Sequence, residues 1–166
     1  MVVDRFVIVD IETTGLKAGR DDIIQISAIR ICNGEPETKA FSQWVRPRAG
    51  YIPPEIETLT GIPSKLVAKA PLIQEVMPKF KEFIGDDLVC GWNVGFDWLF
   101  LTKESPDLHN EVKDLLPLVK EKVPDLPSYK LTNVARHFNL DTQNAHCAIF
   151  DCILTYQVLK ASGLLP

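Results

Sequence analysis

Asp10 and Glu12 have the residue type and the spacing to bind a divalent metal ion. They lie one residue apart in "VIVDIETTGL", where an apolar run from Arg5 to Val9 ends. Side chains alternate along a strand, so the two acids would share a face. Two ionised acids side by side repel each other, and a cation such as Mg²⁺ or Mn²⁺ removes that conflict. An acid that ends a strand is also often a turn residue, and the "TTG" that follows is good turn chemistry.

Two further acids and a histidine strengthen the metal-site interpretation. Asp97 lies in "GWNVGFDWLFL", in the first turn of a predicted helix, where an acid is also favourable for helix-dipole reasons. Asp151 lies in "HCAIFDCILTYQVL", beside the apolar stripe of the last predicted helix, where a charge needs a partner or a metal. His146 precedes Asp151 by five residues, about 140° beyond a full helical turn, so the two would not share a helix face. We expect His146 on the loop or first turn that enters this helix, within reach of a site that Asp151 lines.

The predicted elements would gather these acids at one end of a sheet. Residues 5–9 predict a strand covered on both faces, and residues 22–32 and 38–45 predict a hairpin joined by "NGEPE". Residues 46–71 contain five prolines and are expected to be loop. A fourth strand is predicted within 86–93, and helices are predicted at 72–84, 94–104, 115–123, 131–138 and 145–161. This order predicts an α/β or mixed-sheet domain, in which ligand sites collect at the carboxyl ends of the strands.

Length and composition are those of one globular domain. The chain has 166 residues, of which 46% are hydrophobic and 24% charged, and no stretch approaches the roughly 18 apolar residues of a membrane span. The N-terminus lacks the basic and apolar segments of a signal peptide. The four cysteines form no CxxC pair, so we expect free thiols in a reducing compartment, the cytoplasm. On its face, a net charge of −4 argues against nucleic-acid binding, which usually shows a basic footprint.

Together, the motifs resemble the DEDD superfamily of 3′–5′ exonucleases, in the branch with a histidine in the last motif. That branch includes ribonuclease T and the epsilon proofreading subunit of DNA polymerase III. The family's three motifs are similar to "FVIVDIETTGL", "GWNVGFDWLFL" and "HCAIFD", in the same order. The segment "PPEIETLTGI" is similar to the family's Thr-Gly-Ile loop, and "YKLTNVARHFNL" to the helix before the last motif. One departure is Trp92, which stands where the family often has histidine and which we expect to bear on substrate preference.

The resemblance implies a fold and an activity. The fold is ribonuclease H-like, an α/β arrangement with a mixed five-stranded sheet flanked by helices, in a single exonuclease domain over residues 1–166. Its fifth strand would lie near Val112. The activity is the hydrolysis of phosphodiester bonds from the 3′ end of single-stranded DNA or RNA, with release of nucleoside 5′-monophosphates. Bound metal ions would add local positive charge that a residue count omits.

The resemblance also implies the residues of the site. The carboxylates that hold two Mg²⁺ or Mn²⁺ ions in the family match Asp10, Glu12, Asp97 and Asp151, and the general base that takes a proton from the attacking water matches His146. The positions expected to contact substrate are Thr13, Thr14, Gly15, Leu59, Thr60, Asn93 and Phe96. Of these, Leu59 and Phe96 match positions that pack on the terminal bases, although core packing would explain both residue types equally well.

Two other functions stay open at this point. One is a non-catalytic binding module of a replication or repair complex, and the other is a hydrolase of nucleotides or short oligonucleotides. All five active-site positions are filled, which argues against a lost nuclease. The chain ends at Pro166, directly after the last predicted helix, without the C-terminal tail by which relatives of the proofreading subunit hold their polymerase. We therefore expect a single-stranded 3′ end as the partner rather than a tightly bound polymerase.

Overall fold

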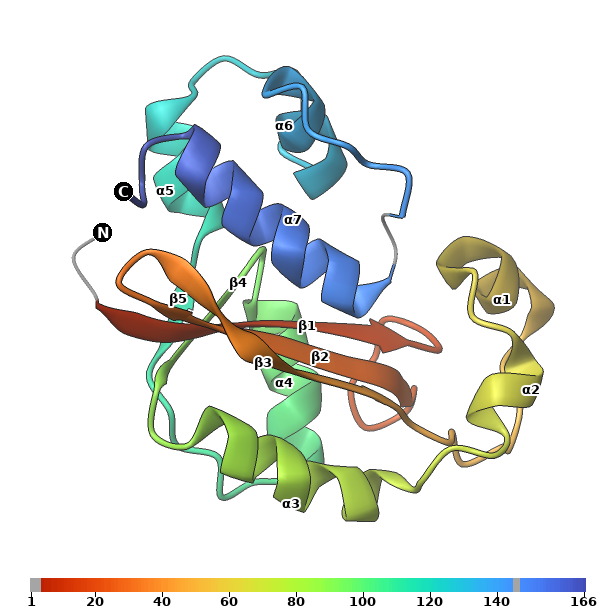
Figure 1. Cartoon of the computed structure of the whole chain (residues 1–166). Helices are drawn as coiled ribbons and strands as arrows, with labels where there is room; N and C mark the ends of the chain where they lie inside the picture. The colour runs from red at the N-terminus through yellow and green to blue at the C-terminus, as the bar shows by residue number, and fades with distance from the viewer. Residues whose placement is uncertain (1–3, 145–146) are drawn as a thin grey trace.

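A five-stranded mixed sheet runs through the middle of the molecule (Figure 1). The computed structural model describes residues 4–144 and 147–166. The strands are β1 (Arg5–Thr13), β2 (Ile23–Cys32), β3 (Glu35–Trp44), β4 (Leu88–Gly91) and β5 (Val112–Asp114). Their order is β3-β2-β1-β4-β5, in which β1 pairs antiparallel with β2 and parallel with β4. The predicted mixed sheet is confirmed, including its fifth strand.

Helices cover both faces of this sheet. They are α1 (Pro54–Thr60), α2 (Ser64–Val67), α3 (Ile73–Ile84), α4 (Gly95–Glu104), α5 (Leu116–Lys122), α6 (Leu131–His137) and α7 (Ala148–Ala161). Figure 1 shows α3 and α4 on one face and α5, α6 and α7 on the other. The short helices α1 and α2 lie beyond the end of the sheet at which β1 finishes (Figure 1).

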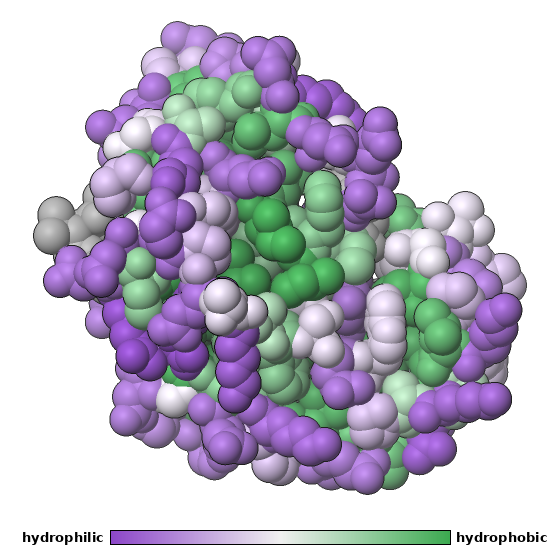
Figure 2. Space-filling view, viewed as in Figure 1, coloured by the Kyte–Doolittle hydropathy of each residue, from purple (hydrophilic) through white to green (hydrophobic). Residues whose placement is uncertain are grey.

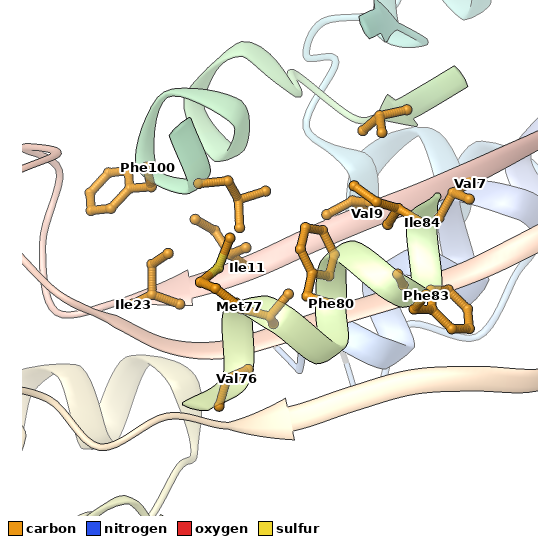
Figure 3. Packing of buried hydrophobic residues seen from close by; sticks show 14 of the residues in the cluster. Val7, Val9, Ile11, Ile23, Val76, Met77, Phe80, Phe83, Ile84 and Phe100 are labelled. Carbon is orange, nitrogen blue, oxygen red and sulfur yellow. The ribbon is translucent and has the colours of Figure 1, made fainter. Parts of the chain in front are cut away.

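The alternation of side chains along β1 decides which layer each residue meets. One series packs against α3 and α4, as Figure 3 shows, and consists of Val7, Val9 and Ile11. The intervening residues Phe6 and Ile8 belong instead to the cluster formed with α5, α6 and α7. Asp10 and Glu12 continue this second series, because every second residue of a strand points to the same face. The two acids therefore face the layer that contains α7.

The proline-rich segment 46–71 differs from its prediction as loop, because it contains α1 and α2. Pro54 begins α1, a position where the missing backbone N–H costs nothing because the first turn leaves that group unpaired anyway. Gly61 ends the helix in a left-handed conformation with φ of 68°, which glycine adopts without steric penalty. Prolines at helix starts were thus mistaken for loop punctuation.

Two element boundaries also differ from the prediction. The hairpin turn is only Asn33 and Gly34, both with positive φ, so that β3 already begins at Glu35 rather than at residue 38. The last helix begins at Ala148 rather than at residue 145, with Cys147 as the residue that precedes its first turn. Residues 145 and 146 lie outside the described residues.

The four cysteines are free thiols, as the sequence predicted. Cys90 and Cys152 are buried in the core. Burial raises the pKa of the Cys90 thiol to about 12, so this side chain serves packing rather than reactivity.

Hydrophobic side chains gather over the middle of the face on which α7 lies, surrounded by hydrophilic ones (Figure 2). Within α7, the side chain of Ile153 is 38% exposed.

None of the helices in the described part of the chain has the length and apolar character needed to cross a membrane.

Candidate active site

Three of the predicted acids meet at the carboxyl end of β1. One carboxylate oxygen from each of Asp10, Glu12 and Asp151 lies within 4.8 Å of the other two. Asp10 and Glu12 come from β1, and Asp151 comes from the first turn of α7 on the same side of the sheet. All three side chains are partly buried. Such a group of oxygen ligands, partly shielded from water, matches the preference of Mg²⁺ and Mn²⁺ for carboxylates.

The fourth acid, Asp97, reaches the same end of the sheet from the first turn of α4. Its side chain is 5% exposed, and its Oδ1 accepts a hydrogen bond of 2.9 Å from the backbone N–H of Ile11. Ile11 lies between Asp10 and Glu12, so this bond ties α4 to the part of β1 that carries the first two acids. The structure therefore brings all four acids to the same end of the sheet. Asp97 lies outside the group of three whose oxygens are within 4.8 Å of one another, and it is hydrogen-bonded to Ile11 between the first two acids.

Burial and mutual repulsion disturb the ionisation of this cluster. The pKa of Asp10 is raised well above its usual range, chiefly by burial and then by the charges of Asp97, Asp151 and Glu12. Burial, with Asp151 and Asp97 close by, raises the pKa of Glu12 to about 8. Burial also raises the pKa of Asp97 to about 7, against the lowering effect of the hydrogen bond from Ile11. A divalent cation among these oxygens would relieve the repulsion, so the residues present fit a metal centre.

A buried amide on β2 holds the beginning of α7 in place. Gln25 is 1% exposed, and its Oε1 accepts a hydrogen bond of 3.1 Å from the backbone N–H of Ala148. Its Nε2 donates to Ser42 Oγ at 3.4 Å and to Cys147 Sγ at 3.9 Å. This side chain thus anchors the helix turn from which Asp151 projects. Gln25 was not among the predicted site residues, although its signal is visible as an amide between apolar residues in "DIIQISAIRIC".

The loop after β1 uses its two hydroxyl groups to hold its own shape. Thr13 Oγ1 donates to the carbonyl oxygen of Gly15 at 2.6 Å, and Thr14 Oγ1 accepts from the backbone N–H of Asp22 at 2.9 Å. A Cβ on Gly15 would lie 2.4 Å from the Asp21 carboxylate, so a side chain here would require that carboxylate to shift. The predicted substrate residues Thr13, Thr14 and Gly15 therefore form a hydrogen-bonded turn that follows Glu12 directly along the chain.

On α1, the two predicted substrate residues have opposite surroundings. Leu59 is 61% exposed, which leaves its side chain open to a ligand. Thr60 is 7% exposed, and its hydroxyl donates to the carbonyl oxygen of Ile56 at 2.8 Å. Only Leu59 offers its side chain at the surface.

Asn93 lies in the connection between β4 and α4, and Phe96 lies in the first turn of α4, directly before Asp97. Asn93 is exposed, has a positive φ of 56°, and donates its backbone N–H to the Asp114 carboxylate at 2.9 Å. Phe96 is half-buried, with its ring centroid 4.9 Å from that of Phe100. Asn93 therefore presents its side-chain amide to solvent, and Phe96 presents one part of its ring.

The predicted base His146 lies outside the described residues. Its neighbour Cys147 is described, and it precedes the first turn of α7 beside Gln25. The prediction for His146 thus stays a prediction.

A mixed five-stranded sheet with carboxylates at the end of its central strand is the ribonuclease H-like arrangement of metal-dependent nucleases. Comparison with protein families agrees with this class. Residues 7–159 match the RNase T family, described as exonuclease, and the chain belongs to this family. The predicted family and fold are confirmed.

Similar proteins agree with this assignment. The chain is 35% identical to the DNA polymerase III subunit epsilon of Aquifex aeolicus, over 92% of this chain and 77% of that protein. It is 39% identical to the DNA polymerase III PolC-type of Clostridium perfringens, over 96% of this chain but only 11% of that protein's length. Among solved structures, E. coli exonuclease I in complex with a dA16 oligonucleotide has a TM-score of 0.81 at 20% identity, covering 98% of this chain and 41% of that one. This last likeness shows the fold.

Proposed function

We propose that this domain is a metal-dependent 3′–5′ exonuclease that shortens single-stranded DNA or RNA and releases nucleoside 5′-monophosphates. The observation that carries the proposal is the convergence of Asp10, Glu12 and Asp151, with Asp97 behind them, at one end of the sheet. The similar proteins support it, since one is a DNA polymerase III subunit and another was solved with an oligonucleotide.

Within this proposal, each acid has a distinct part. Asp10, Glu12 and Asp151 present the oxygens that would hold Mg²⁺ or Mn²⁺, and Asp97 completes the set from α4. Two such ions, when bound, supply positive charge for the attacking and leaving oxygens of an in-line displacement. His146 is proposed to take the proton from the attacking water, because a neutral imidazole accepts a proton readily near pH 7.

The decisive experiment is a cleavage assay on 5′-labelled single strands of DNA and RNA. The protein is incubated with Mg²⁺, with Mn²⁺ or with chelator, and Asp10→Asn is treated in parallel. A ladder that shortens from the 3′ end, and that chelator and the substitution both remove, is the expected result. Strands that stay intact in every lane would overturn the proposal. Retained binding of those strands would then indicate a binding module, and cleavage of dinucleotides alone would indicate an oligonucleotide hydrolase.

The names of the relatives also raise the question of a polymerase partner. We propose the free 3′ end as the first partner, and co-elution with a polymerase subunit in size-exclusion chromatography as the test for a second. A complex that survives the column would add the polymerase to the partners.

A further inference from the structure

A hollow adjoins the acids on the β4 side of β1. It has a volume of about 620 Å³ and is lined by Trp92, Asn93, Leu116, Tyr129, Lys130, Leu131, Thr132 and Asp151. We call it the Trp92 pocket. Its volume is within the range of pockets that bind small ligands. Because Asp151 belongs both to the acidic cluster and to this wall, whatever occupies the Trp92 pocket lies beside the reacting phosphate.

The aromatic wall of the Trp92 pocket is held rigidly. The indole N–H of Trp92 donates to the carbonyl oxygen of Tyr129 at 3.0 Å. The Tyr129 hydroxyl in turn donates to the carbonyl oxygen of Val123 at 2.8 Å and accepts from the N–H of Leu126 at 3.2 Å. A preorganised aromatic surface suits a flat ligand, because little side-chain entropy is lost on binding. Nucleobases stack on such side chains whatever their sequence.

The rim of the Trp92 pocket adds a positive charge. Lys130 is exposed at the start of α6, and among the described residues no acid lies within salt-bridge distance of its ammonium group. A free ammonium beside an aromatic wall is suited to a phosphate that accompanies a stacked base. Asn93 contributes an exposed side-chain amide to the same rim. A nucleotide therefore fits the chemistry of the pocket better than an uncharged apolar ligand does.

The sheet order places the pocket on the opposite side of the acids from α1. Helices α1 and α2 pack against Ile24 of β2 and Trp44 of β3. The Trp92 pocket instead follows β4 and β5, and β1 with its acids lies between the two sides. A strand whose terminal nucleotide contacts Leu59 on α1 would cross the acids and continue into the pocket.

We propose that the Trp92 pocket binds the penultimate nucleotide of the substrate, on the 5′ side of the bond that is cut, with Trp92 against its nucleobase and Lys130 near its phosphate. This inference rests on the proposed exonuclease function. It makes Trp92 a specificity-determining residue, in accordance with the expectation that this departure from the family bears on substrate preference.

The test compares two substrates and two variants. The methyl ester of thymidine 5′-monophosphate has one nucleotide and only a methyl group beyond the bond that is cut, so it cannot extend into the pocket, whereas a single-stranded 12-mer can. Trp92→His keeps a ring N–H donor but loses most of the stacking surface, and Lys130→Ala removes the charge. Lys103→Ala, an exposed lysine of α4, is the matched control. We expect KM for the 12-mer to rise about tenfold in both pocket variants relative to any change on the ester, with the control unaffected.

An abasic sugar identifies the position. Removing the base of the penultimate nucleotide should raise KM for the parent protein by a similar factor and add little to Trp92→His. If KM rises equally for the ester and the 12-mer in the pocket variants, or does not change for the 12-mer, the pocket proposal is overturned. The exonuclease proposal would still stand. If the parent cleaves neither substrate, the exonuclease proposal fails. The pocket is then decided by fluorescence anisotropy of labelled dT12 in Ca²⁺, where an unchanged Kd in both pocket variants would overturn it.

Discussion

Asp10 occupies a position that disfavours its own charge. Burial, together with three neighbouring carboxyl groups, raises the pKa of Asp10. Stability is given up here for function, because the same arrangement that repels itself attracts a divalent cation. A substitution that keeps the shape of the side chain but removes its charge can separate the loss of stability from the gain in metal binding.

Asp10→Asn is predicted to inactivate the domain and to stabilise its metal-free form. Replacing a carboxylate by an amide removes a metal ligand, and rates should fall by more than about 100-fold, since even the groups behind a ligand are worth 10–100-fold. In chelator, the melting temperature should rise, because the substitution removes a carboxyl group whose ionised form is disfavoured in the folded protein by burial and by the neighbouring acids. The cleavage assay and a thermal melt check both effects. Retained activity, or a lower melting temperature in chelator, would contradict the assignment.

The pH dependence of stability follows from the raised pKa values. Glu12 and Asp97 have pKa values of about 8 and about 7 in the folded protein, above their ordinary values of 4.5 and 3.8. At pH values between the ordinary pKa and the raised pKa of each group, the folded state binds more protons than the unfolded state. The free energy of unfolding therefore falls as pH rises through this range. In chelator, the melting temperature should therefore be several degrees lower at pH 8 than at pH 5, and Mn²⁺ should restore it at pH 8.

Glu12→Gln is the control for this pH effect, because it cannot ionise and should flatten the profile. A melting temperature that is constant or rises between pH 5 and pH 8 in chelator would show that the cluster does not repel itself as described.

At the scale of elements, the site depends on how α7 is docked on the sheet. Helix α7 contacts both β1 and β2, and its first turn carries Asp151. The hydrogen bond from the Ala148 N–H to Gln25 is one of the polar contacts at this junction, and Cys152 Sγ donates to the carbonyl oxygen of Ser27 one turn further along. A small rotation of α7 would move Asp151 relative to Asp10, so we interpret Gln25 as a positioning residue.

Gln25→Leu is predicted to loosen this junction. It leaves the N–H of Ala148 without its acceptor in a buried place, at a cost of about 1–3 kcal/mol. Because Asp151 loses its support, Mn²⁺ affinity should fall by about tenfold and kcat should fall with it, whereas KM should change less. Isothermal titration and steady-state kinetics measure these quantities. Gln74→Leu, the same change at an exposed position of α3, serves as the control. Unchanged Mn²⁺ affinity in Gln25→Leu would limit Gln25 to packing.

At the scale of the whole molecule, the net charge of −4 limits how substrate is held. A net negative charge works against holding a long strand through many phosphate contacts. The structure is consistent with a short contact, because the acids, the loop after β1 and the Trp92 pocket all lie at one end of the sheet.

Cleavage is accordingly predicted to depend weakly on salt. With about two phosphates neutralised, the logarithm of 1/KM should fall against the logarithm of salt concentration with a slope of about −1.4. Lys130→Ala should make this slope shallower by about 0.7. The measurement is KM for a single strand from low to high KCl at constant Mg²⁺. A slope of about −4 or steeper would contradict this prediction, because it would indicate many more phosphate contacts than two.

Much of the fold was predictable because strand and helix periodicities are local. The alternation in β1 predicted a shared face for Asp10 and Glu12, and the apolar spacing of residues 72–84 predicted α3. The same local signals misassigned α1 and α2, since a proline at the start of a helix looks the same in sequence as a proline in a loop.

The sequence by itself determined which residue types were available, which acids shared a strand face and, through ordered motifs, the family. Only the tertiary structure decided how these residues meet. Asp97 binds Ile11 across 86 residues of chain, and Gln25 binds Ala148 across 123. The Trp92 pocket likewise joins residues from β4 to α7. Such contacts depend on strand order and helix docking, which arise from packing of the whole core, whereas sequence patterns report only on neighbours within a few residues.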